Sequence, residues 1–198
     1  GLNIGIVGAL FVLILALPAF RIGNEEALKS QVLAVTFLDR YGNAIGHRGA
    51  RHDDSLKLEE MPDHLLKAVI ATEDRRFYEH HGVDFNALIR SAISTGTGDT
   101  QGGSTLTMQY VKQVRYYQAG DDKKKQEAAV AINLQRKMED AKCALFIEGN
   151  LHESKQRILD NYLNIAFFGE HSYGIQTAAE TYFNKPASKL TLAESALL

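Results

Sequence analysis

Residues 62–82 read PDHLLKAVIATEDRRFYEHHG, and this stretch sets the helical character expected for most of the chain. Positions 66, 69, 73 and 77 follow one another at spacings of three and four residues, which predicts one face of a helix. Three of these positions are apolar, Leu66, Val69 and Phe77, but the fourth is Glu73. Loss of hydration there favours proton uptake by a carboxylate, which suits a general base. A structural carboxylate paired with a buried cation fits the pattern equally well.

Apolar residues at helical spacing continue almost to the end of the chain and are interrupted by glycines. They predict helices over 62–79, 105–117, 127–148, 155–165 and 175–183. A capping box of Thr191 and Glu194 predicts one more helix. Because that helix has no stop signal before Leu198, we expect the domain to continue beyond it. The chain is therefore predicted to be mainly helical.

The first twenty residues differ in kind from the rest. Residues 2–20 carry no charge, and as a helix they would span about 29 Å, close to the thickness of the hydrocarbon core of a bilayer. We therefore expect a transmembrane anchor over 1–21, although Ala16 and Ala19 resemble a signal-peptide cleavage site. A stem with a short β hairpin or edge strand is expected over 22–51, and a helical domain over 52–198.

Composition limits the classes of function. The chain has 198 residues, enough for one globular domain and an appendage, and 45% of them are hydrophobic, which argues against disorder. Lys and Arg number 22 and Asp and Glu 24, so the net charge of −2 gives no reason to expect a nucleic-acid partner. Cys143 is the only cysteine, so we expect neither an intrachain disulfide nor a cysteine metal cluster.

Residues 102–105, Gly-Gly-Ser-Thr, are a candidate anion site. The two glycines allow close approach of a ligand, and Ser104 is placed to cap the helix that follows. Free N–H groups at a helix N-terminus bind phosphate well. Thr105, Gln109 and Lys112 share one face of this helix, so the lysine cation lies along the same groove. A plain helix cap is the alternative interpretation.

A second candidate for anion binding is Arg136-Lys137, with Asp140 four residues after the arginine. Arg136 and Asp140 fit a surface ion pair, worth about 0.5 kcal/mol. Alternatively, the two cations hold a pyrophosphate leaving group, a usual task of Arg and Lys.

Two other polar features have ordinary interpretations. His80 and His81 precede Gly82, which predicts a helix C-cap rather than a metal site, because adjacent histidines on a helix point in different directions. Lys123–Lys125 predict an exposed charged run, with contact to anionic lipid headgroups as the alternative.

The order of these pieces carries more information than any one of them. Five motifs follow one another along the chain: Glu73-Asp74-x-x-Phe77-x-x-His80-x-Gly82; Gly102-x-Ser104-Thr105-x-Thr107-x-Gln109; Arg136-Lys137; Lys155-x-x-Ile158-Leu159-x-x-Tyr162-Leu163-Asn164-x-x-x-x-Gly169; and Gly174-Ile175-x-x-Ala178-Ala179-x-x-Tyr182-Phe183. Over residues 52–198 this order resembles the family 51 peptidoglycan glycosyltransferases, which occur in class A penicillin-binding proteins and as monofunctional enzymes.

The resemblance implies a fold, a reaction and a location. The fold would be a mainly helical, lysozyme-like large lobe with a small membrane-associated jaw lobe, preceded by one N-terminal transmembrane helix. The enzyme would polymerise lipid II into β-1,4 glycan strands with inversion, releasing undecaprenyl pyrophosphate. It would act outside the bacterial plasma membrane on a single-pass anchor. Its implied partners are lipid II, the growing glycan chain, a C-terminal transpeptidase domain and the cell-wall machinery.

The resemblance also implies site residues. Glu73 matches the base that deprotonates the acceptor's 4-hydroxyl, and Asp140 stands at a second catalytic carboxylate. The implied substrate-binding residues are Asp74, Phe77, His80, Ser104, Thr105, Gln109, Lys112, Arg136, Lys137 and Asn164. No metal-ligating residue and no required cofactor are implied, although Mg²⁺ or Mn²⁺ could accompany the pyrophosphate.

The chain departs from the family pattern at a few positions. Met108 stands where the family has Gln, Asn184 where it has Gly, and Asp140 and Asp160 where Glu is usual. The shorter arm of Asp140 moves its charge by about 1 Å, which matters where catalysis depends on placement. Two other functions compete with the polymerase: a lysozyme-like hydrolase or lytic transglycosylase, and an inactive scaffold.

Overall fold

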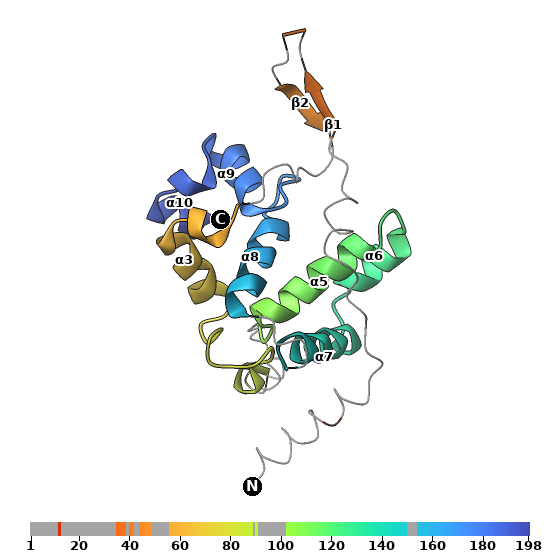
Figure 1. Ribbon diagram of the computed structural model, residues 1–198. Coiled ribbons are helices and arrows are strands. Elements are labelled where there is room, and N and C mark those ends of the chain that lie inside the picture. The colour runs from red at the N-terminus through yellow and green to blue at the C-terminus, as the bar shows by residue number, and fades with distance from the viewer. Residues whose placement is uncertain are drawn as a thin grey trace.

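The computed structural model describes residues 12, 35–38, 40–41, 44–48, 56–88, 90, 102–149 and 154–198. The described part is mainly helical, as predicted (Figure 1). Its helices include η1 (Leu58–Glu60), α3 (Asp63–Glu73), α5 (Leu106–Gln118), α6 (Lys123–Val130), α7 (Leu134–Gly149), α8 (Lys155–Ile165), α9 (Ile175–Phe183), η2 (Ala187–Lys189) and α10 (Leu192–Leu197). No helix within these residues is both long and apolar enough to cross a bilayer. The predicted anchor lies outside the described residues, apart from Val12.

Two strands form an antiparallel hairpin before the helices. Strand β1 (Val35–Leu38) pairs with β2 (Ala44–Arg48), with a register shift between Phe37 and Leu38. The hairpin stands apart from the helices in Figure 1. It falls in the segment where a short hairpin or edge strand is predicted.

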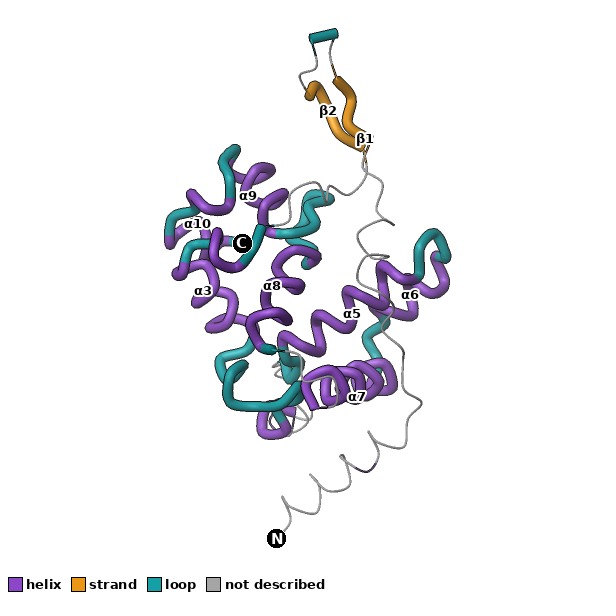
Figure 2. The backbone as a smooth tube through the Cα atoms, in the orientation of Figure 1, coloured by secondary structure: helices purple, strands orange, loops and turns teal. Residues whose placement is uncertain are grey.

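Helix α5 organises the core. It packs against α6, α7 and α8, and Figure 2 shows it between α7 and α8. One face buries Leu106, Val111 and Val114 in the main core, while Met108 belongs to a smaller cluster with residues of α7. On the other side of α8, α3 packs against α10. The site is built where these helices meet.

The predicted helix over 62–79 is wrong beyond residue 73. Helix α3 ends at Glu73, because Asp74 leaves helical geometry with φ −159° and ψ 77°. The Asp74 carboxylate instead accepts a hydrogen bond from the backbone N–H of Leu106, at 3.0 Å, and lies 2.9 Å from Nε2 of His80. This buried hydrogen bond to the first residue of α5 takes the place of another helical turn after Glu73. Phe77 is therefore not on the helix, and it is fully buried in the core.

The predicted helix over 127–148 is two helices. The chain breaks between Val130 and Leu134, where the Asn133 side chain accepts a hydrogen bond from the N–H of Arg136 at 2.8 Å. A side-chain oxygen in this position starts a new helix. By contrast, α8 and α9 begin and end as predicted, and the capping box of Thr191 and Glu194 opens α10.

Gly82 lies where the chain passes close to the backbone of α7, and it does not cap a helix. Its φ is +79°, and a Cβ built there would lie 2.4 Å from the backbone oxygen of Ala144 on α7. Its own carbonyl accepts a hydrogen bond from Oγ1 of Thr105 at 2.6 Å. The predicted C-cap role of His80 is therefore wrong, since residues 75–79 form turns and the chain here packs directly onto α7.

Candidate active site

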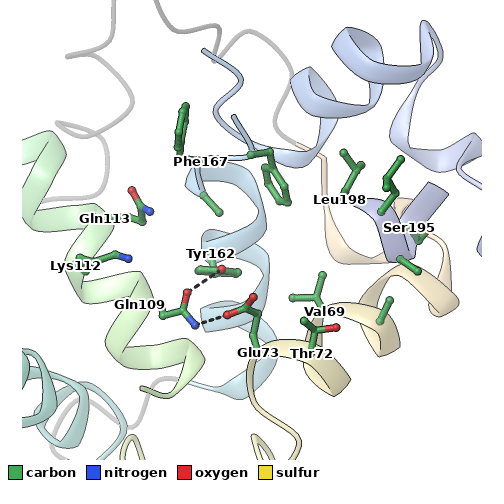
Figure 3. Close-up of a pocket in the computed structure, with 15 residues that line it drawn as sticks. Val69, Thr72, Glu73, Gln109, Lys112, Gln113, Tyr162, Phe167, Ser195 and Leu198 are labelled. Atoms are coloured by element: carbon green, nitrogen blue, oxygen red, sulfur yellow. Dashed lines mark hydrogen bonds between the residues drawn. The ribbon is translucent and has the colours of Figure 1, made fainter. Parts of the chain in front are cut away.

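Glu73 is the last residue of α3 and its side chain is exposed, so the burial predicted from the helical pattern is wrong. The reason is the early end of the helix, which places the side chain at the rim of the core. The carboxylate faces a cavity of about 450 Å³ whose walls come from α3, α5, α8, the loop after α8 and α10 (Figure 3). Its lining includes Val69, Gln109, Tyr162 and Phe168.

One hydrogen bond orients Glu73 within this cavity, and a second one holds its donor. Nε2 of Gln109, on α5, donates to Oε2 of Glu73 at 2.6 Å. The hydroxyl of Tyr162, on α8, donates to Oε1 of Gln109 at 3.3 Å. Figure 3 shows both bonds, which link side chains on α8, α5 and α3. The carboxylate is exposed to solvent on one side and held by an amide on the other.

Lys112 supplies a cation to the same cavity. It follows Gln109 by one helical turn on α5 and its side chain points toward the space beside Glu73 (Figure 3). Partial burial lowers the pKa of Lys112, and the positive charge of Arg136 acts in the same direction. The charges of Asp140 and Glu73 oppose this shift. Lys112 thus lies in the electrostatic field of both the third motif and Glu73.

Asp140 lies in a buried ionic cluster beside this lysine. Its carboxylate is only 1% exposed and receives Nη1 of Arg115 at 2.9 Å together with Nη1 of Arg136. Arg115 also donates to Glu139 at 2.8 Å. Burial raises the pKa of Asp140, and the two arginines act against that shift. The interpretation of Arg136 and Asp140 as a surface pair is therefore wrong.

Arg115 is a member of this cluster that the motif pattern does not reveal. One signal pointed to it: Arg115 follows Lys112 by three residues, so both lie on one side of a helix. Nothing local indicates that its partners are Glu139 and Asp140 on α7, because the three residues meet only when α5 packs against α7.

A second cavity, of about 550 Å³, lies on the other side of Glu73. Thr72 and Glu73 line both cavities, so the carboxylate stands where they meet. The lining of the second cavity is rich in arginine: Arg75, Arg76 and Arg90, with Asp84, Gly102, Ser104 and Thr105. Nε of Arg76 donates to the Asp84 carboxylate at 2.9 Å. The Glu73 carboxylate therefore lies between two cavities, each lined by at least one cationic side chain.

Residues 41–198 match the sequence model of a family described as Transglycosylase, which is most of the chain. The chain belongs to the transglycosylase family. This is the family 51 glycosyltransferase domain that the five motifs resemble, so the resemblance is confirmed.

Named relatives are similar over most of the transglycosylase chain. Penicillin-binding protein 1A of Vibrio cholerae serotype O1 is 41% identical over 160 residues, 79% of this chain and 18% of that protein. Penicillin-binding protein 1A of Aquifex aeolicus is 33% identical over 202 residues, 98% of this chain and 26% of that protein. Penicillin-binding protein 1F of Bacillus subtilis is 35% identical over 167 residues, which are 81% of this chain and 21% of that protein. The chain spans about a quarter or less of the length of these relatives.

Several predicted substrate-binding residues of the transglycosylase domain have structural contacts within the protein. Phe77 is in the core, where the ammonium group of Lys155 lies 4.5 Å from the centre of its ring. Thr105, and not Ser104, caps α5, because its side chain accepts the N–H of Met108 at 3.2 Å. The Asn164 amide bonds both the N–H and the carbonyl of Leu56, at 3.0 and 2.9 Å.

The remaining predicted residues fall into two groups around Glu73. Gln109 and Lys112 line the first cavity, while Ser104 lines the second. Arg136 and Lys137 start α7 beside Lys112, and burial lowers the pKa of Lys137, with the charge of Arg136 adding to it. Buried Asp74 lines the second cavity, where it accepts the N–H of Leu106 and bonds the partly buried His80. The structure thus brings together one exposed carboxylate and several cations.

Proposed function

We propose that this transglycosylase domain is a peptidoglycan glycosyltransferase that polymerises lipid II into β-1,4 glycan strands. Membership of the family supports this reaction class. The observation that carries the proposal is the position of Glu73 at the junction of two cation-lined cavities. A polymerase needs room for a donor and an acceptor on either side of its base, and both of these substrates carry anionic groups.

In this proposal Glu73 is the general base. Its carboxylate takes the proton of the acceptor's 4-hydroxyl, and the freed oxygen attacks the anomeric carbon of the donor sugar. The bond from that carbon to the pyrophosphate breaks, the configuration inverts, and undecaprenyl pyrophosphate leaves. An exposed carboxylate held by Gln109 is accessible to a bound hydroxyl and stays in one orientation.

The cations are proposed to stabilise the leaving group. Lys112, Arg136 and Lys137 are partly buried, so they are incompletely hydrated and gain from an anionic ligand. Asp140 is buried and forms ion pairs with Arg136 and Arg115. We therefore assign Asp140 to positioning Arg136, instead of to a direct catalytic step.

A divalent cation at the pyrophosphate stays a prediction from the sequence. Among the described residues, no group of three His, Cys, Asp or Glu side chains is placed to hold a metal ion. The carboxylates of Glu139 and Asp140, beside the proposed cation cluster, are already bonded to arginines. Because this donor set suits an anion and not Mg²⁺ or Mn²⁺, no step of the proposed reaction runs through a metal.

We also propose that the enzyme works at the outer face of the bacterial plasma membrane, held by a single-pass anchor over 1–21. The joint between α6 and α7 supports a membrane-associated small lobe. Val130, Ile132 and Leu134 are exposed apolar side chains there, and the exposed lysines 123–125 begin α6. Apolar side chains beside a basic run suit the surface of an anionic bilayer. A transpeptidase domain and cell-wall machinery are the partners that we propose.

Incubation of the full chain with lipid II tests the reaction. Formation of glycan polymer, lost in Glu73→Gln, is the expected result. Cleavage of added glycan strands would instead indicate a lysozyme-like hydrolase, and absence of both activities a scaffold. The variant Glu79→Gln is a suitable control, because Glu79 is an exposed carboxylate in the turns after α3.

A further inference from the structure

The hydrogen bonds around Glu73 run from the core to the cavity. Tyr162 is buried on α8, Gln109 is partly buried on α5, and Glu73 is exposed at the end of α3. The Tyr162 hydroxyl donates to Gln109, and the Gln109 amide donates to Glu73. Each helix thus contributes one group to a single line, visible in Figure 3.

We infer that Tyr162 and Gln109 are positioning residues for the base, with Tyr162 fixing the amide of Gln109 and that amide holding the Glu73 carboxylate turned toward the acceptor. The inference rests on the proposed function, because it assigns roles around the proposed base. It also changes the predicted role of Gln109, from binding substrate to acting on Glu73.

The two ends of the Gln109 amide explain why Tyr162 matters. An amide carries a donor NH₂ at one end and an acceptor oxygen at the other, whereas a carboxylate only accepts. If the amide were reversed, two acceptors would face each other at the base. The Tyr162 hydroxyl donates to Oε1 of Gln109 and so satisfies that end of the amide in the orientation in which Nε2 faces Glu73.

Tyr162 is suited to remain a donor. Burial raises the pKa of its hydroxyl, and the negative charge of Glu73 adds to that shift. The hydroxyl therefore keeps its proton throughout the pH range in which the base ionises. The pair therefore presents a fixed N–H donor to the Glu73 carboxylate and holds it in one orientation.

Other charged groups line the two cavities beside Glu73 and form a constant background for a test. By element, they are Lys112 on α5, then Asp74, Arg75 and Arg76 after α3, and Asp84 and Arg90 across the second cavity. Residues 195–198 of the C-terminal segment line the first cavity and carry no charged side chain. The variants below leave these groups in place.

The test measures lipid II polymerisation by the full chain against pH. Gln109→Leu removes the amide, and Tyr162→Phe removes only the hydroxyl that orients it. The matched control is Tyr117→Phe: Tyr117 is a buried tyrosine on α5 whose hydroxyl donates to the carbonyl of Ile165 at 2.9 Å, not to Gln109. Thermal unfolding of each variant shows whether it is folded.

We expect Gln109→Leu to lower kcat by about tenfold to a hundredfold, the cost of a hydrogen bond to a charged group. The acid limb of its pH profile should move to higher pH, because the variant loses a hydrogen bond donated to the charged form of the carboxylate. Tyr162→Phe should shift the limb in the same direction by a smaller amount, with KM little changed. Tyr117→Phe should leave the limb where the wild type has it.

A rise in KM with an unmoved acid limb in Gln109→Leu would show that Gln109 binds substrate, and would overturn the inference. An acid limb in Tyr162→Phe that equals the limb of Tyr117→Phe would also overturn the inference. If Gln109→Leu does not fold, the pH profile of Tyr162→Phe provides the test by itself. Carbon-13 NMR titration of the Glu73 carboxyl gives a readout without turnover. If the wild type forms polymer but neither variant shifts the pH profile or the NMR titration, the positioning roles are wrong and the proposed function stands. If the variants shift the titration but the wild type makes no polymer, the proposed function alone is wrong.

Discussion

The guanidinium of Arg115 on α5 donates to the buried carboxylate of Asp140 on α7 at 2.9 Å, across 25 positions of sequence. Arg136 donates to the other oxygen of the same carboxylate. Asp140 is therefore a counter-ion shared by two arginines, one in the third motif and one outside it. This sharing holds Arg136 beside Lys112, so in the proposed function stability and catalysis depend on the same carboxylate.

Arg115→Met should destabilise the protein in a pH-dependent manner. Burial raises the pKa of Asp140 above its ordinary value of 3.8. The protonated carboxyl therefore stabilises the folded protein at pH values below the pKa of Asp140 in the unfolded chain. This contribution is lost as the pH rises through the pKa of Asp140 in the folded protein. Without Arg115 the pKa rises further, and the loss is larger. We expect a decrease of about 2 kcal/mol in the free energy of unfolding at neutral pH and a smaller one near pH 4, measured by urea unfolding. Equal losses at both pH values would contradict this view of Asp140, and Arg75→Met, at an exposed arginine, is the control.

Lys112→Met should lower turnover by about tenfold to a thousandfold, as for other lost electrostatic contacts to a transition state. Charge stabilisation of a leaving group acts mostly in the transition state, so kcat should fall more than KM rises. Steady-state kinetics with lipid II measure both. Lys189→Met, at an exposed lysine of η2, should behave as wild type. A Lys112 variant with normal kcat would remove this lysine from the proposed site.

Thr105→Ala should cost about 1–2 kcal/mol of stability, because Thr105 is the N-cap of α5 and also donates to Gly82. Ser104→Ala should change stability by less than about 0.5 kcal/mol, since that side chain faces the second cavity. Urea unfolding of the two variants compares neighbouring hydroxyls directly. The opposite order would mean that Ser104 caps the helix, as the sequence pattern first indicated.

Ile132→Asp should weaken membrane association without unfolding the domain. Ile132 is fully exposed between α6 and α7, so a charge there costs little in water but much at a bilayer surface. Flotation with anionic liposomes, using the chain without residues 1–21, measures the contribution of this joint separately from that of the anchor. Equal flotation of the variant and its parent would show that the joint does not contact lipid. Leu192→Asp, at an exposed leucine of α10, is the matched control.

Local patterns were sufficient to predict much of the fold. Helices α8 and α9 have the predicted bounds, and Thr191 with Glu194 opens α10 as predicted, because helical periodicity and capping depend on residues within one or two turns. The order of five motifs also sufficed to predict the family, which the comparison confirmed. All of this information lies in short spacings along the chain.

The tertiary structure decided what those spacings cannot encode. Asp74 bonds the start of α5 and ends α3 at Glu73, so the carboxylate predicted to be buried is exposed and Phe77 is in the core. Gln109 meets Glu73 across 36 positions, and Arg115 meets Asp140 across 25. Hydrogen-bond partners so far apart in sequence are chosen by which helices pack together, and that packing minimises the exposed apolar surface of the whole chain rather than of any single segment.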